Sequence, residues 1–151
     1  MLLSSRSDAR FEVAGSADTV LNTFMDHMNV CFCFDGLVRV FEEGIFDLWS
    51  LDPAADDYQP HPYASAFFYM GHLIRNRVGH EIEEDRWNVV HLMGICSRGM
   101  ASPHVEVRRA ALLCLVDISK QWTLQQDGFW ARIGDMLSPS QLHLLQAYVA
   151  Q

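Results

Sequence analysis

The chain has four cysteines and seven histidines, which are typical zinc ligands. The closest arrangement is His27 followed by the thiols of Cys31 and Cys33. Zinc sites usually present a Cys-x-x-Cys pair or a Cys/His pair at zinc-finger spacing, and this cluster matches neither pattern. All four cysteines, Cys96 and Cys114 included, lie among apolar neighbours. We therefore expect buried, reduced thiols and no cofactor, with a metal site at His27, Cys31 and Cys33 as the alternative.

Known catalytic motifs are missing from the sequence. Residues 80–84, HEIEE, begin like the HExxH helix of zinc proteases, but they lack the second histidine that such a helix needs to hold zinc from one face. The chain also has no GxSxG nucleophile elbow, no Walker loop and no GxGxxG phosphate loop. The sequence therefore favours a binding protein over an enzyme.

The charge of the chain is uneven. Its net charge is −8, and residues 1–74 hold eleven carboxylates against three arginines, so this half alone accounts for −8. Nucleic-acid binding is disfavoured because it needs a clear positive face. The acidic half instead favours a protein partner with a basic segment, and the alternative is an ordinary solvated acidic surface.

Neither a membrane span nor a secretion signal is expected. The longest apolar runs, such as residues 66–70, fall far below the about 18 residues that span a bilayer. Residues 1–15 lack the basic start and the apolar run of a signal peptide. Together with the reduced cysteines, this predicts a cytoplasmic or nuclear protein.

Apolar residues recur with helical spacing almost throughout the chain, and no segment shows the alternation of a half-buried strand. Ser16 is a good N-cap for the first helix, Gly79 and Gly99 are typical C-terminal stops, and the run Val30–Phe34 is interpreted as a helix end or turn. The pattern predicts a loop at residues 50–62 and helices at residues 17–30, 37–49, 62–78, 81–98 and 103–120, followed by two short helices that begin at the capping boxes Thr123–Gln126 and Ser138–Gln141.

One predicted helix carries a repeat signature. It follows the V-R-x-x-A-x-x-x-L-x-x-I spacing of the second helix of a HEAT repeat, with Val107, Arg108, Ala111, Leu115 and Ile118. Stacked hairpins are therefore favoured over a globular bundle. The predicted fold is all-α, with about seven helices arranged as antiparallel helical hairpins stacked as a short HEAT-like α-solenoid. The expected domain organisation is a flexible N-terminal segment at residues 1–15 and a single domain at residues 16–151.

The C-terminal third of the chain resembles a known family. Residues 107–118, VRRAALLCLVDI, and residues 137–151, LSPSQLHLLQAYVAQ, are similar to two motifs, V-R-K-A-x-x-x-C-L-V-x-I and L-x-x-S-x-x-K-L-L-x-x-Y-I. These motifs belong to the extreme C-terminal HEAT-like domain of the cytoplasmic-linker-associated proteins (CLASPs). The first motif is common to HEAT repeats, whereas the closing helix is more particular. His143 stands where the family usually has lysine.

The resemblance implies a role in partner recruitment. CLASPs regulate microtubule plus ends and kinetochores, and their C-terminal domain recruits cytoplasmic linker proteins, a kinetochore motor and cortical anchors. A location on the microtubule cytoskeleton, at the spindle or kinetochore, follows from it. Tubulin-binding array domains of the same family present basic and aromatic residues on turns along one edge, and the turns at residues 50–62 and 75–81 of this chain do not present such an edge of tryptophan with lysine or arginine. Tubulin is therefore the less favoured partner, and an unrelated helical adaptor or scaffold is the remaining alternative.

Tryptophans are the first candidates for partner contacts because they are enriched at binding hot spots. Trp122 and Trp130 bracket a predicted turn, although such rings more often pack within helical hairpins. We expect a short basic or helical segment of a partner to lie in the groove between the later hairpins, anchored by one of these rings. The candidate partner-binding residues are Trp122, Trp130, Arg109, Lys120 and His143.

Overall fold

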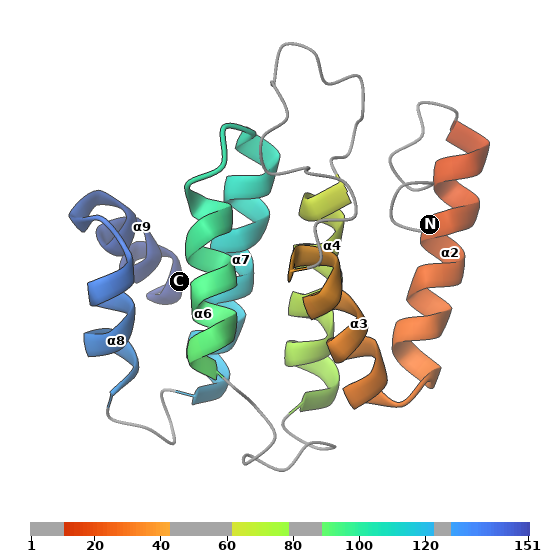
Figure 1. Cartoon of the computed structure of the whole chain (residues 1–151), viewed down its shortest axis with the longest axis horizontal. Helices are drawn as coiled ribbons and strands as arrows, with labels where there is room; N and C mark the ends of the chain where they lie inside the picture. The colour runs from red at the N-terminus through yellow and green to blue at the C-terminus, as the bar shows by residue number, and fades with distance from the viewer. Residues whose placement is uncertain (1–10, 43–61, 79–88, 123–127) are drawn as a thin grey trace.

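The computed structural model describes residues 11–42, 62–78, 89–122 and 128–151 (Figure 1). In this part of the chain every regular element is a helix, and no strand is present. This confirms the predicted all-α fold built from helical hairpins. The elements are α2 (Phe11–His27), α3 (Val30–Glu42), α4 (Pro62–Leu73), the π-helical turn η1 (Ile74–Val78), α6 (Val89–Met100), α7 (Val105–Trp122), α8 (Phe129–Met136) and α9 (Pro139–Val149).

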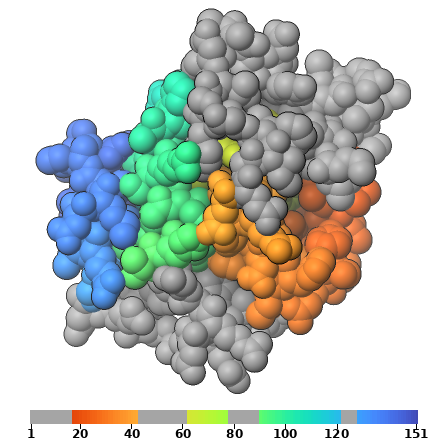
Figure 2. All heavy atoms as spheres, in the orientation of Figure 1, coloured from red at the N-terminus to blue at the C-terminus, as the bar shows by residue number. Residues whose placement is uncertain are grey.

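The helices lie side by side in two rows. One row consists of α4, α7 and α9, with α7 packed against both of the others. The other row consists of α3, α6 and α8, which succeed one another across the face seen in Figure 2. The two rows are joined because α3 packs on α4, α6 on α7, and α8 on α9. None of the described helices is long and apolar enough to cross a bilayer.

Helix α2 begins earlier than the sequence pattern predicts. It starts at Phe11, so the expected N-cap Ser16 lies inside the helix, and residues 11–15 are part of it. Serine costs less than about 0.7 kcal/mol relative to alanine inside a helix, so a good capping residue does not force a helix to start. Residues 1–10 lie outside the described part of the chain.

Helix α3 also begins earlier, at Val30, within the run interpreted as a helix end or turn. Asn29 caps this start because its side-chain oxygen accepts a hydrogen bond from the Phe32 N–H at 3.2 Å. The predicted second helix and this run are therefore one helix, as its buried stripe shows: Val30, Cys33, Leu37 and Phe41. The rest of the predicted second helix, residues 43–49, and residues 50–61 of the predicted loop lie outside the described residues.

Helix α4 begins at Pro62, as predicted, and is buried almost all round because α3 and α7 cover it from two sides. Phe68 is its one large apolar side chain that is exposed. In the turn η1 that follows, two arginines reach different neighbours. Arg75 bonds to α7, while Arg77 Nη1 donates to the carbonyl oxygens of Met25 and Met28 at 2.7 and 2.6 Å. Arg77 thereby satisfies free carbonyl groups at the end of α2.

The predicted HEAT stripe on α7 is confirmed as a buried face, with no exposed surface on Val107, Ala111, Leu115 or Ile118. The small side chain of Ala111 lets α6 approach α7 closely. Gly99 is the residue of α6 at this contact. A Cβ atom at Gly99 would lie 2.6 Å from Phe67 Cζ and 2.7 Å from Ala111 Cβ. The prediction that Gly99 ends its helix was therefore wrong: α6 continues to Met100, and the glycine is there for close packing.

This packing predicts opposite effects for two glycines on α6. Gly99→Ala should lower the free energy of unfolding by about 1–3 kcal/mol, because Phe67 and Ala111 are fully buried and cannot move aside freely. Gly94→Ala is the matched control. Nothing lies within 4 Å of a Cβ there, so it should raise the free energy by up to about 1 kcal/mol through helix propensity. Urea melts of both variants test this, and equal effects would contradict it.

Helix α9 begins with the predicted capping box. The Gln141 N–H donates to Ser138 Oγ at 3.3 Å, and the Ser138 N–H donates to Gln141 Oε1 at 2.9 Å. Gln141 Nε2 also donates to the Met100 carbonyl oxygen at 3.3 Å, which ties the start of α9 to the end of α6. The other predicted box, at residues 123–126, lies outside the described residues, and α8 begins at Phe129.

Candidate functional site

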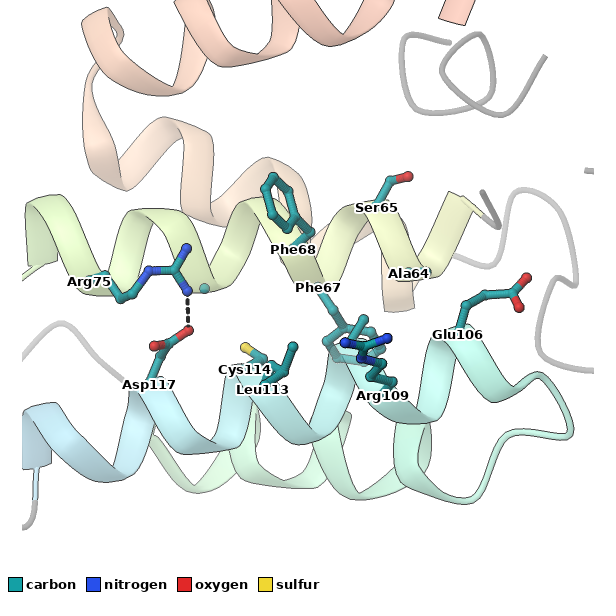
Figure 3. A pocket seen from close by; sticks show the side chains of 12 residues that line it. Ala64, Ser65, Phe67, Phe68, Arg75, Glu106, Arg109, Leu113, Cys114 and Asp117 are labelled. Atoms are coloured by element: carbon teal, nitrogen blue, oxygen red, sulfur yellow. Dashed lines mark hydrogen bonds and ion pairs between the residues drawn. The ribbon is translucent and has the colours of Figure 1, made fainter. Parts of the chain in front are cut away.

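A first groove, of about 280 Å³, runs between α4 and α7 (Figure 3). Phe68 on α4 and Leu113 on α7 line it and are 49% and 41% exposed. Arg75 and Asp117 stand at one end of the groove and Arg109 stands towards the other (Figure 3). The groove is thus an apolar hollow with charged side chains near both ends.

The charges at the first end of this groove form a tight pair. Arg75 Nη1 donates to Asp117 Oδ2 at 2.5 Å, and Asp117 is buried while Arg75 is half-exposed. Gly71 makes room for this pair, because a Cβ there would lie only 2.7 Å from Asp117 Oδ2. Burial raises the pKa of Asp117, although the Arg75 guanidinium opposes the change. The pair therefore joins α4 and η1 to α7 at the cost of desolvating a carboxylate.

The raised pKa of Asp117 predicts how stability depends on pH. Below the unfolded-state pKa of about 3.9, the carboxyl is protonated in both states. As the pH rises, the unfolded chain loses its proton first, so stability falls until the pH passes the raised folded-state pKa. The free energy of unfolding of the wild type, relative to Asp117→Asn, should therefore decrease over this range and then level off. Urea melts of both proteins at a series of pH values test this, and a difference that grows with pH would be the opposite result.

The cysteines are placed for packing. Cys114 lines the first groove but is almost fully buried; a hydrogen bond with Cys96 and burial raise its pKa well above the ordinary range. Burial also raises the pKa of Cys33, whose Sγ donates to the Phe24 carbonyl oxygen at 3.7 Å. Protonated thiols are poor nucleophiles and poor metal ligands. Among the described residues, no three His, Cys, Asp or Glu side chains are grouped as metal ligands.

A second groove, of about 470 Å³, runs between the first half of α7 and α9. Val105 and Leu112 contribute its α7 wall, and Leu144 and Tyr148 contribute its α9 wall. Three of these side chains are strongly exposed: Val105 by 66%, Leu144 by 45% and Tyr148 by 36%. Since Leu145 is fully buried beneath them, α9 presents one apolar face to the core and a second to the groove.

Two arginines also line the α7–α9 groove. Arg108 Nη1 donates to the carbonyl oxygens of Ser102 and Pro103 at 2.7 and 2.9 Å, so two backbone groups hold its guanidinium, and no carboxylate of the described residues pairs with it. Arg109 forms no hydrogen bond or ion pair with another described residue. Among the described residues, no carboxylate lines this groove. The groove therefore combines an apolar surface with two arginine side chains.

Of the candidate contact residues, Arg109 lines both of these grooves. Lys120 and His143 are exposed but line neither. Trp130 is half-buried, and its ring packs edge-on against the preceding phenylalanine with centroids 5.2 Å apart. Trp122 is the last residue of α7, and its side chain lies outside the described part. Trp130 therefore does not line the α7–α9 groove and packs instead against the hydrophobic core.

Three apolar side chains of the second groove, Val105, Leu144 and Tyr148, were not among the contact residues expected from the sequence. Leu144 and Tyr148 stood there only within the segment that resembles the family. Leu144 and Tyr148 are one helical turn apart and therefore share a face, which is the signal that could have found them. Comparison of the chain with protein-family models, with curated proteins and with solved structures finds no match.

Proposed function

We propose that this chain is a non-catalytic protein-interaction module that recruits a partner through the α7–α9 groove. The observation that carries the proposal is the exposure of Val105, Leu144 and Tyr148 around one hollow, beside two arginines. Large apolar side chains gathered in this way mark interaction surfaces, whereas single exposed ones are ordinary. Such a hollow can take up an anchor side chain and shield it from water, which is how binding hot spots work.

The partner-recruiting C-terminal domain of a CLASP-like microtubule-associated protein is the specific role that we propose. In its support, the two segments that resemble the family, residues 107–118 and 137–151, contribute most of both walls of the groove. The partners are then adaptor proteins of microtubule plus ends, kinetochores or the cell cortex. The chain would work in the cytoplasm on the microtubule cytoskeleton, including the spindle.

The experiment is an affinity capture with the full chain from a cytoplasmic extract, quantified by mass spectrometry against the variant Leu144→Asp. We expect plus-end, kinetochore or cortical adaptors to bind the wild type and to be depleted at least about tenfold with the variant, because a charge in the hollow cannot be desolvated cheaply. Thermal melts check first that the variant is folded.

A microtubule co-sedimentation assay distinguishes the tubulin alternative. We expect the purified chain to stay in the supernatant when no adaptor is present. Tight co-sedimentation would replace partner recruitment by direct tubulin recognition. Capture of the same proteins by the wild type and by Leu144→Asp would mean that the α7–α9 groove is not the recruitment site.

A further inference from the structure

We propose that the occupant of the α7–α9 groove is an acidic amphipathic helix, with apolar side chains on one face and carboxylates beside them. This inference rests on the proposed function, because it gives the chemistry of the partner at the same groove. It follows from two features of the groove, namely the backbone around it and the charge along it.

The walls of the groove favour a helical occupant over an extended one. Both walls are helices whose backbone groups are bonded within each helix, so the groove offers no free strand edge to an extended peptide. A helical segment satisfies its own backbone and only has to bury side chains. The apolar contacts also match a helix, since Val105 and Leu112 are two turns or about 10 Å apart on α7, and Leu144 and Tyr148 are one turn apart on α9.

The charge along the groove selects an acidic helix. The Arg108 guanidinium is held by two carbonyl oxygens, and Arg109 has no partner among the described residues, so both are available to a carboxylate without breaking an ion pair. Arginine binds carboxylates through two parallel hydrogen bonds, which fixes the register of the occupant as well as its sign. A basic helix would meet like charge here. The basic segment expected from the net charge fits the acidic first half of the chain and not this groove.

The test uses three fluorescein-labelled synthetic peptides of about 16 residues, stapled because free helices of this length are marginal in water. All three carry the same leucine stripe, flanked by glutamate, glutamine or lysine. We expect fluorescence anisotropy with the full chain to show the tightest binding for the glutamate peptide, weaker binding for the glutamine peptide and the weakest for the lysine peptide. The affinities of the first and the last should differ at least about tenfold. Raising the salt concentration should reduce this difference.

Two charge reversals on α7 separate the groove from the overall charge of the protein. Arg109→Glu should abolish the ranking, because the new carboxylate offsets the remaining charge of Arg108 in the groove. Lys120→Glu makes the same charge change on the same helix at an exposed site that lines neither groove, and it should leave the ranking intact. Leu144→Ala should weaken the binding of all three peptides to the same extent.

Equal affinities, tighter binding of the lysine peptide, no binding of any peptide, or equal effects of the two reversals would each overturn the inference. The proposed function is judged separately by the affinity capture. If Leu144→Asp loses the captured adaptors while the peptides show no charge preference, the groove recruits a partner of different chemistry. If Leu144→Asp leaves the captured adaptors unchanged and Leu144→Ala leaves peptide binding unchanged, both proposals fail.

Discussion

Leu115→Ala is expected to lower the free energy of unfolding by about 2–5 kcal/mol. Leu115 has no exposed surface and lies in the middle of α7, which packs against α4, α6 and α9. Removing its isobutyl group leaves a cavity that three neighbouring helices cannot easily close. The loss is measured by urea unfolding followed by circular dichroism at the helical band.

Leu113→Ala is the matched control, two residues away on the same helix. Leu113 is 41% exposed, so the same truncation there should cost less than about 1 kcal/mol. A cost below about 1 kcal/mol for Leu115→Ala as well would mean that the HEAT stripe does not form the core. Ala111→Leu makes the opposite change, because it adds volume to the core. We expect it to lower the free energy of unfolding by about 1–3 kcal/mol through overpacking.

Features that depend on neighbouring residues in the chain were predictable from the sequence. The buried stripe of α7 follows from apolar residues three and four positions apart. The capping box at Ser138 follows from two side chains that bond to each other's backbone within three residues. In both cases the interacting atoms are close in sequence, so the spacing contains the information.

Features that depend on other helices were not predictable in this way. Gly99 has the sequence context of a helix stop, and its true role is set by Phe67 and Ala111, which come from two other helices. The space at Gly71 is set in the same way by Asp117, which comes from α7. A single sequence records which residues are apolar, but not which helix will approach them.

The same limit applies to the candidate site. Arg109 was among the expected contact residues, whereas Val105, Leu144 and Tyr148 were not. Helix α9 carries apolar residues on more than one face, and the position of α7 decides which face is covered. Leu145 is therefore buried, and the adjacent Leu144 lines the groove.

Leu144→Asp and Tyr148→Ala are expected to weaken binding of the captured adaptor by about 30-fold or more each. This corresponds to about 2 kcal/mol, the usual loss when an anchor at the centre of an interface is removed. Both side chains are already exposed in the free protein, so neither change should cost more than about 1 kcal/mol of folding stability. Isothermal titration with the purified adaptor measures the affinity, and urea melts measure the stability.

His143→Asp is the control for Leu144→Asp. It introduces the same charge at the adjacent position of α9, on an exposed side chain that lines neither groove. We expect its affinity to stay within about threefold of the wild type, as for a charge at the rim of an interface. A loss as large as that of Leu144→Asp would point to charge repulsion across a wider surface and not to the groove.

Amide hydrogen exchange with and without the bound adaptor locates the recruitment surface most directly. We expect new protection to centre on the first half of α7, from Val105 to Leu112, and on α9 from Leu144 to Val149. Exchange in α2 and α3, at the other end of the stack, should be unchanged. Protection confined to α2, α3 or the α4 side of α7, with α9 unaffected, would contradict recruitment through the α7–α9 groove.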